Sequence, residues 1–334
     1  MKVILCTGDS HTCGQGADNI LSATKVKNPN DRYDTSGKGL GGGACDLVIP
    51  GYVNLVRQFV VENTDSRHAL EDMQILNEKY GYPLDEDGVL LNKELVIENS
   101  WDMILLCVGE RLEAAEIAVY LDGKLYKNET LHTPVPRYND WSFRNVPIRC
   151  EGVKEVKIVP VSGKPFIRQI QYASGEYVVI NSGIGSCTSK RYFNECFDYC
   201  VTDFQPDIVV AEGHSINDWI QYATAQEHYD CLKVMLEKFK EMGAKVLFTT
   251  VSPIESKQEN AAGNLYKDFI DASRQVAADL DIPVADAHEK FCEALAPIPK
   301  EERSAYMYVD KWHVNARGHK IYADAIWEKL KDML

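Results

Sequence analysis

The first and last parts of the chain alternate short apolar runs with longer amphipathic stretches. A short apolar run between turn residues is typical of a buried strand, and apolar residues spaced three and four apart are typical of a helix. The runs predict strands at Val3–Cys6, Tyr177–Ile180, Asp207–Ala211, Lys245–Val251 and Pro283–Asp286. The amphipathic stretches predict helices at Pro50–Glu62, Lys190–Thr202, Gln226–Met242, Tyr266–Leu280 and Ala316–Leu330. This alternation predicts a five-stranded parallel sheet covered on both faces, a three-layer α/β/α domain.

Between residues 65 and 175 the pattern changes to short, often alternating apolar runs. Asp122-Gly123 separates two of these runs and is a two-residue hairpin signal. Several short strands with turn signals about every 8–12 residues favour a β-sandwich. The sequence therefore predicts a jelly-roll-like β-sandwich at 65–175, inserted into a discontinuous α/β domain at 1–64 and 176–334.

Charge and hydropathy exclude several partners. The chain has 334 residues and a formal net charge of −14, which argues against binding to nucleic acid or to anionic membrane surfaces. No apolar run approaches the ~18 residues of a membrane span. Val3–Cys6 is shorter than the about 7–15 apolar residues of a signal-peptide core, so we expect a cytoplasmic protein. Charge and composition are compatible with a homo-oligomer and do not decide the oligomeric state.

The ten cysteines are spread along the chain and include no Cys-x-x-Cys pair. Cys196 and Cys200 lie one helical turn apart on a predicted helix. A structural zinc site would need clustered cysteine and histidine ligands, and none appear. We interpret the cysteines as buried free thiols of a reducing compartment.

Gly37, Gly39 and Gly42 match the spacing of a dinucleotide-binding fingerprint. That fingerprint must follow a strand directly and open a helix. Polar residues from Asn28 to Thr35 precede the glycines instead. We therefore interpret this stretch as an active-site loop, since loops carry much of the chemistry of α/β folds.

Ser10 follows the first predicted strand, after the turn residues Thr7-Gly8-Asp9. Ligands of open α/β sheets bind beyond the carboxyl ends of the strands. A serine nucleophile needs a base and a group that orients the base, and Asp310 and His313 near the end of the chain offer both. Without such partners Ser10 would read as a polar turn residue, and His313 as a loop histidine ahead of a helix.

Three motifs occur in the order found in one enzyme family: Gly8-Asp9-Ser10, Ile216-Asn217-Asp218 and Asp310-Lys311-Trp312-His313. With them, residues 1–64 and 176–334 resemble the SGNH hydrolases, also called the GDSL esterase/lipase family. The resemblance implies a flavodoxin-like fold and a serine ester hydrolase that needs no metal or organic cofactor. It implies Ser10 as nucleophile, His313 as base and Asp310 as the residue that orients His313.

The resemblance also implies an oxyanion hole. Its donors would be the backbone N–H of Ser10, the side-chain amide of Asn217, and the N–H of Gly185 or Ser186. Asn217 could instead be a turn-former before a helix. The chain departs from the family pattern at Ser186 and Ser215, where glycines are usual, which bears on the shape of the pocket. His11, which stands where the family often has leucine, and His214, Trp219 and Trp312 are candidates for contact with substrate. Alternatively, the histidines support other site residues or face solvent, and the tryptophans pack in the core.

We predict that the substrate is an O-acetylated oligosaccharide, such as a xylo-oligosaccharide. A β-sandwich often binds glycans, although fold alone does not establish function. Trp219, Trp312 and Tyr308 lie near the predicted catalytic turns, no long apolar lid-like stretch is evident, and carbohydrate acetylesterases of the family commonly carry an extra β-sandwich. The alternatives are a broad-specificity esterase, lipase or thioesterase, and a non-catalytic glycan-binding protein.

Overall fold

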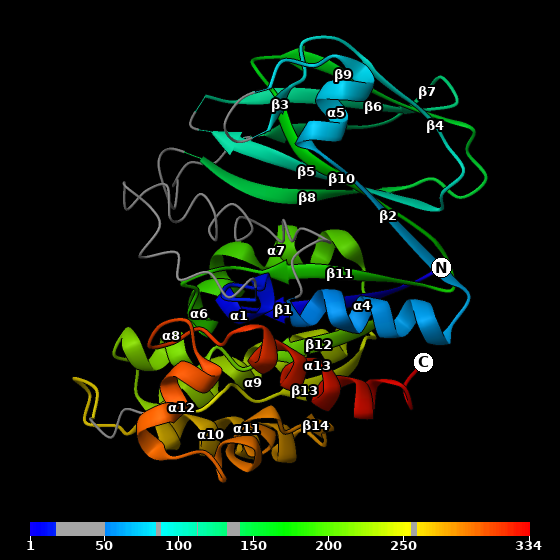
Figure 1. The fold of residues 1–334 in the computed structure, drawn as a ribbon. Coiled ribbons are helices and arrows are strands. Elements are labelled where there is room, and N and C mark those ends of the chain that lie inside the picture. Colours follow the sequence, from blue (N-terminus) through cyan, green and yellow to red (C-terminus); the bar gives the residue numbers. More distant parts are fainter. Residues whose placement is uncertain (18–50, 85–87, 112, 132–140, 255–258) are drawn as a thin grey trace.

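The computed structural model describes the chain except residues 18–50, 85–87, 112, 132–140 and 255–258 (Figure 1). The glycine-rich stretch at 37–42 lies outside the described residues. None of the described helices is both long and apolar enough to cross a membrane.

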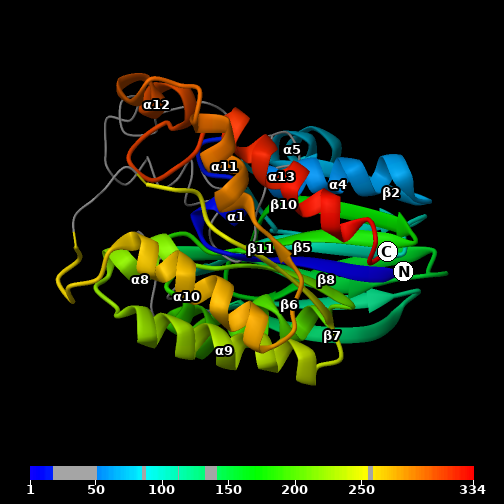
Figure 2. The ribbon, with the colours of Figure 1, turned by 90° about the horizontal axis from the view of Figure 1, so that it is seen from below.

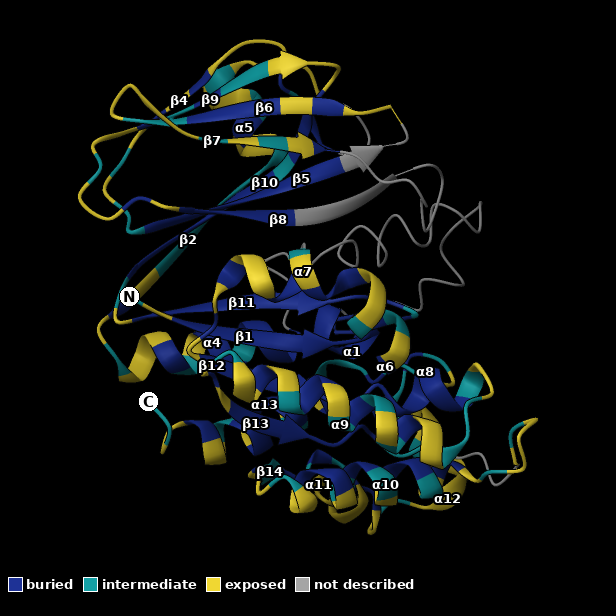
Figure 3. Ribbon diagram, turned by 180° about the vertical axis from the view of Figure 1, so that it is seen from behind, coloured by how far each residue is buried: buried dark blue, intermediate teal, exposed yellow. Residues whose placement is uncertain are grey.

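The lower part of the molecule in Figure 1 is built on one parallel sheet. Its order is β11 (Tyr177–Gly183), β1 (Lys2–Gly8), β12 (Ile208–Glu212), β13 (Lys245–Thr249) and β14 (Val284–Ala285). β1 lies between β11 and β12, with Gly8 opposite Gly183 and Thr7 opposite Ala211. These strands are almost continuously buried, as expected for a parallel sheet with both faces covered (Figure 3). The five predicted strands are all present.

Helices cover both faces of this sheet, as the view from below shows (Figure 2). On one face lie α4 (Tyr52–Asn63), α11 (Ala287–Leu295) and α13 (Ala316–Leu330). On the other lie α7 (Phe197–Cys200), α9 (Ala225–Glu241) and α10 (Tyr266–Asp279). The short helices α1 (Ser10–Cys13), α8 (Ser215–Ile220) and α12 (Lys300–Met307) complete this unit.

The helix predicted at 190–202 is broken. It consists of α6 (Ser189–Arg191), a π-helical turn η1 (Tyr192–Cys196), α7 and a 3₁₀ turn η2 (Thr202–Phe204). The Tyr192 ring is completely buried, and its hydroxyl donates a 2.8 Å hydrogen bond to the carbonyl of Ser182. The π-helical turn therefore occurs where the Tyr192 side chain is anchored in the core. This anchoring is a tertiary contact, which the spacing of apolar residues cannot predict.

The upper part of Figure 1 consists of two antiparallel sheets. One has the order β2 (Ser66–Asp72), β10 (Phe166–Gly175), β5 (Met103–Arg111), β8 (Trp141–Arg149), with β3 (Val89–Leu90) beside β10. The other has the order β4 (Leu95–Glu98), β9 (Glu155–Ser162), β6 (Ala115–Leu121), β7 (Lys124–Leu131). Both sheets contribute to one hydrophobic cluster, with α5 (Met73–Tyr80) also packed there. Asp122 (φ 45°) and Gly123 (φ 77°) form the predicted hairpin turn between β6 and β7.

The two parts are joined through packing as well as through the chain. β10 ends at Gly175 and β11 begins at Tyr177, so the strands are nearly continuous. Met103 and Leu105 of β5 pack in the same cluster as Phe204 of the parallel-sheet unit. The guanidinium of Arg149 donates a 2.9 Å hydrogen bond to the carbonyl of Phe204. The domain boundaries at 64/65 and 175/176 stay a prediction.

Candidate active site

Three short segments, referred to below as the three turns, meet beyond the carboxyl ends of the parallel strands. The first runs from the end of β1 into α1 and carries Asp9, Ser10 and His11. The second runs from the end of β12 into α8 and carries Asn217, and the third precedes α13 and carries Asp310 and His313. Glycine is required at position 8, because a Cβ there would lie 2.1 Å from Oγ1 of Thr12 and 2.3 Å from Oε2 of Glu212. The close approach of β1 to Glu212 thus fixes where Ser10 leaves the strand.

Ser10, His313 and Asp310 form a continuous hydrogen-bonded row. Nε2 of His313 lies 3.0 Å from Oγ of Ser10, and Nδ1 lies 2.7 Å from Oδ2 of Asp310. The other carboxylate oxygen of Asp310 accepts the backbone N–H groups of Trp312 and His313, each at 2.7 Å. These distances are those of a nucleophile, its base and the residue that orients the base.

The charge state of Asp310 suits that arrangement. Burial favours the neutral acid, but the hydrogen bond and the charge of His313 lower the pKa of Asp310 to about 2. The carboxyl group is therefore ionised near neutral pH and accepts the Nδ1 proton of His313. That leaves Nε2 of the neutral imidazole as an acceptor for the Ser10 hydroxyl.

Asn217 lies close to the same turn but faces Asp9. Its side-chain Nδ2 donates a 2.6 Å hydrogen bond to Oδ2 of Asp9, and both residues are buried. A carboxamide nitrogen carries two protons, so one remains for another acceptor. No role of Asp9 was predicted, although the residue is part of the Gly-Asp-Ser motif.

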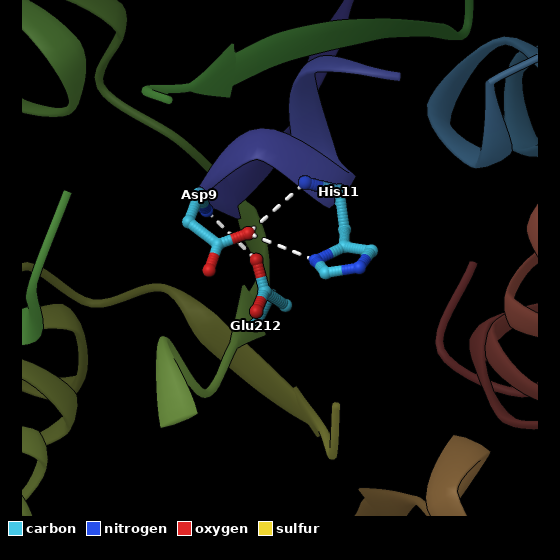
Figure 4. Close-up of side chains that lie close together, drawn as sticks. All are labelled: Asp9, His11 and Glu212. Carbon is cyan, nitrogen blue, oxygen red and sulfur yellow. Dashed lines mark hydrogen bonds and ion pairs between the residues drawn. The ribbon is translucent and has the colours of Figure 1, made fainter. Parts of the chain in front are cut away.

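Asp9, His11 and Glu212 form a completely buried cluster (Figure 4). Oδ1 of Asp9 accepts the backbone N–H of His11 at 3.0 Å and lies 3.1 Å from its Nδ1. Burial lowers the pKa of His11, but the hydrogen bond and charge of Asp9 and the charge of Glu212 raise it to about 8. Burial and the negative charge of Asp9 raise the pKa of Glu212.

The three side chains have the composition of a metal site, but their surroundings do not fit one. Oε2 of Glu212 accepts the backbone N–H of Asp9 at 2.7 Å and the hydroxyl of Thr12 at 3.1 Å. Oε1 accepts the backbone N–H of His214 at 3.2 Å. The oxygens of both carboxyl groups thus face N–H or O–H donors, and a cation there would be placed against the same donors. The cluster is a hydrogen-bonded ion network.

The predicted oxyanion donors lie at the ends of β1, β11 and β12. Ser10 begins α1, where the first N–H groups have no acceptor within the helix. Gly185 is buried and Ser186 half-buried, and both follow β11. Ser186 has φ 54°, a left-handed conformation that favours glycine, at the position where the family usually has one. Ser215, the second departure, is buried with its Oγ 3.2 Å from Oγ of Ser273.

The other candidates for substrate contact differ in exposure. His214 is completely buried, with Nδ1 3.0 Å from the carbonyl of Cys187. Trp219 is 7% exposed and its indole N–H donates to the carbonyl of Asn264 at 3.1 Å. Trp312 is half-buried, and its ring centroid lies 6.1 Å from that of Trp219.

A second buried network lies beside Asn217. Oδ2 of Asp218 lies 2.5 Å from Nδ1 of His228, and Nε2 of His228 lies 2.8 Å from Oγ of Ser273. Asp218 also accepts the backbone N–H of Ser189 at 2.9 Å. Asp218 therefore ties the Asn217 turn to the segment that follows Gly185 and Ser186. The sequence signal for this role is a charged residue at the start of a short helix, which also fits an ordinary cap.

Residues 163–321 match the sequence profile of the GDSL-like Lipase/Acylhydrolase family. The match contains Asn217, Asp310 and His313, while Ser10 precedes it. Over these residues the chain is similar to the SGNH (GDSL) hydrolases, and this match confirms the resemblance that the motifs predicted.

Several solved structures are similar to this chain. Axe2, an acetylxylan esterase from Geobacillus stearothermophilus, is 22% identical, with 46% of this chain and 71% of Axe2 covered and a TM-score of 0.39. The acetyl xylan esterase AlAXEase is 21% identical, with 46% and 81% covered and a TM-score of 0.40. Protein YXIM from Bacillus subtilis is 12% identical, with 72% and 80% covered and a TM-score of 0.44. No curated protein matches the chain.

Of the nine described cysteines, seven are buried as expected, whereas Cys231 is half-buried and Cys292 is exposed.

Proposed function

We propose that this protein cleaves carboxylic esters through an acyl-enzyme on Ser10. The observation that carries the proposal is the row from Ser10 Oγ to His313 Nε2 at 3.0 Å and from His313 Nδ1 to Asp310 at 2.7 Å. A serine hydroxyl is a weak nucleophile by itself and becomes effective beside an oriented base.

In the first half-reaction the Oγ of Ser10 bonds to the ester carbonyl carbon, while its proton passes to Nε2 of His313. Asp310 stabilises the imidazolium that forms. Collapse of the tetrahedral intermediate breaks the bond to the alcohol oxygen, which takes the proton back from His313. Water then attacks the acyl-enzyme with His313 again as base, and the carboxylic acid leaves Ser10 free.

The negative oxygen of each tetrahedral intermediate needs donors that are already in place. We assign this role to the backbone N–H of Ser10, the backbone N–H of Gly185 or Ser186, and the side-chain amide of Asn217. Asn217 is suited because Asp9 holds one of its two amide protons, which fixes the direction of the other. Fixed donors need no reorganisation during the reaction.

Covalent labelling by a fluorophosphonate tests the nucleophile. We expect labelling of the wild type at Ser10, located by mass spectrometry, and none in Ser10→Ala. Ser304→Ala is the matched control, because Ser304 is an exposed serine on α12. A folded wild type that stays unlabelled, or a Ser10→Ala variant that is labelled, contradicts the proposal.

For the substrate we propose a small acyl group, acetyl, on an oligosaccharide. The sequence carries no long apolar lid-like stretch of the kind that would shelter a long acyl chain, which favours a short one. The half-buried Trp312 stands two residues from Asp310 and offers an aromatic face on which a sugar ring can stack. We further interpret the two antiparallel sheets with their shared core as the inserted β-sandwich, which would extend the surface available to a glycan.

A further inference from the structure

The ring of His11 bridges two of the three turns. Its Nδ1 lies 3.1 Å from Oδ1 of Asp9, and its Nε2 lies 2.9 Å from the carbonyl oxygen of Trp312, 301 residues further along the chain. The side chain is completely buried. His11 therefore connects the turn that carries Ser10 to the turn that carries His313, without being exposed to solvent.

Each of the two contacts requires a proton on its own ring nitrogen, Nδ1 or Nε2. A backbone carbonyl only accepts, so Nε2 of His11 must donate to Trp312. The Asp9 carboxylate also accepts the backbone N–H of His11 and the side-chain amide of Asn217, so it acts as an acceptor toward Nδ1 as well. A ring that donates from both nitrogens is an imidazolium. Its pKa, raised to about 8 chiefly by the hydrogen bond and charge of Asp9 against the effect of burial, is consistent with that state.

The carbonyl that His11 holds belongs to the peptide unit between Trp312 and His313. The N–H of the same unit donates to Oδ1 of Asp310 at 2.7 Å. Because a peptide unit is planar, fixing its oxygen and its N–H fixes the whole plane. The plane fixes the N–Cα bond of His313, from which its side chain departs, and Oδ2 of Asp310 orients the ring.

We propose that His11 is a positioning residue: a buried imidazolium that holds the Trp312–His313 peptide unit and thereby sets His313 against Ser10. The inference rests on the proposed function of Ser10 and His313. The Asp9–His11 ion pair also reaches Asn217 through Asp9, so one buried pair joins all three turns.

At high pH the His11 imidazolium would lose one of its two N–H protons, and with it one of its two hydrogen-bond donors. The titratable groups that face His11 come from the turn after β1, from β12, from the third turn and from α13. They are Asp9, Glu212, His313, His319 and Tyr322. Since the pKa of His11 is raised, its positioning contribution is complete below the ordinary pKa of histidine and is lost as pH rises through about 8.

The test is His11→Gln, assayed with p-nitrophenyl acetate across pH 5.5–9.5. Glutamine can still donate to Trp312 but carries no charge to pair with Asp9. We expect kcat to fall about 100-fold, as small misplacements of reacting groups do, with KM within about twofold. We also expect the decline of wild-type kcat above pH 8 to be absent from the variant.

His288→Gln is the matched control, because His288 contacts the backbone carbonyl of Val251 at 2.9 Å, outside the three turns. It should keep the wild-type kcat and pH profile. Wild-type kcat and pH profile in a folded His11→Gln would overturn the proposal. The ring ¹⁵N spectrum of wild-type His11 decides the matter if that variant does not fold: two protonated nitrogens at pH 7 support it, and a neutral ring overturns it.

Failure of the proposed function gives a different result, because a wild type that fluorophosphonate does not label lacks the Ser10 nucleophile. A wild type that is labelled, combined with an unaffected His11→Gln, removes only the role of His11.

Discussion

The side-chain amide of Asn217 donates a 2.6 Å hydrogen bond to the carboxylate of Asp9, across 208 residues of sequence. Asp9 is therefore more than the residue before the proposed nucleophile. It holds the proposed oxyanion donor Asn217 with one oxygen and pairs with His11 through the other. The spacing of two proposed catalytic groups thus depends on a residue that neither attacks nor transfers a proton.

Asn217→Ala should lower kcat by about 10²–10³-fold, the loss that follows removal of one oxyanion-hole donor. The measurement is kcat and KM with p-nitrophenyl acetate. Asn128→Ala, at an exposed position of β7, serves as the control and should be unaffected. Unchanged kcat in Asn217→Ala would remove Asn217 from the oxyanion hole.

Asp9→Asn and Asn217→Ala should be strongly non-additive. If Asp9 acts on the reaction partly by holding Asn217, both single variants lose the effect of that contact. The double variant loses it only once, so its total loss in kcat/KM is smaller than the two single losses combined. We expect Asn217→Ala to cost at least about tenfold less in the Asp9→Asn background than in the wild type. Additive losses in a double-mutant cycle on kcat/KM would show that Asp9 acts independently of Asn217.

Asp310→Asn should lower kcat by about 10⁴-fold while the protein stays folded, as substitution of a triad aspartate does. The reason is that the amide no longer fixes the tautomer of His313 or stabilises its cation. The control is Asp324→Asn, whose carboxylate pairs with Lys320 on the surface of α13. A loss below about tenfold would mean that another group orients His313.

His319 should make the fold sensitive to acid. Its Nε2 lies 3.0 Å from the carbonyl of Gln15, and its Nδ1 accepts the backbone N–H of Tyr52 at 3.3 Å, so the buried ring is neutral. Burial lowers its pKa to about 3, whereas an unfolded histidine titrates near 6.5. The unfolded state therefore takes up the proton first, and stability is lost as pH falls from 6.5 toward 3.

Urea unfolding of wild type and His319→Gln at pH 7.0 and 4.5 tests this. Between the two pH values the wild type should lose more free energy of unfolding, by up to about 1.4 kcal/mol for each pH unit below 6.5. Glutamine can supply one donor and one acceptor without titrating. Equal losses in both proteins would assign the acid sensitivity to other groups.

The acyl preference can be measured with p-nitrophenyl esters from acetate to octanoate. We expect kcat/KM to be highest for acetate and to fall steeply by hexanoate, because the proposed substrate carries an acetyl group. Acetate release from acetylated xylo-oligosaccharides should accompany that result. A maximum at octanoate, without acetate release from any sugar, would favour a lipase or thioesterase.

Strands and helices with a strong local signal could be predicted closely. Ala316–Leu330 is helical over the predicted range, and Asp122-Gly123 forms the predicted turn, because apolar spacing and turn chemistry decide both locally. Two observed elements were not predicted, β2 (Ser66–Asp72) and α11 (Ala287–Leu295). β2 is mostly polar and half-buried, and it is held by its pairing with β10, which no local pattern reveals.

Some residues of the candidate site could also be predicted from sequence, and others could not. Ser10, Asp310 and His313 could be proposed from sequence because each lies in a short motif at the end of an element. Glu212 could not, because its burial beside Asp9 follows from the register of β1 against β12. The bridging position of His11 likewise depends on where the third turn passes, which the sequence near residue 11 does not encode.

The position of β1 in the parallel sheet also bears on how the protein is made. β1 is synthesised long before both of its neighbours, which begin far downstream at Tyr177 and Ile208. A nascent chain therefore carries an apolar strand with two open edges while the antiparallel sheets are synthesised, a state prone to aggregation. We expect nascent chains halted before Tyr177 to expose β1 to chaperones, and esterase activity to appear only after the His313 turn has emerged.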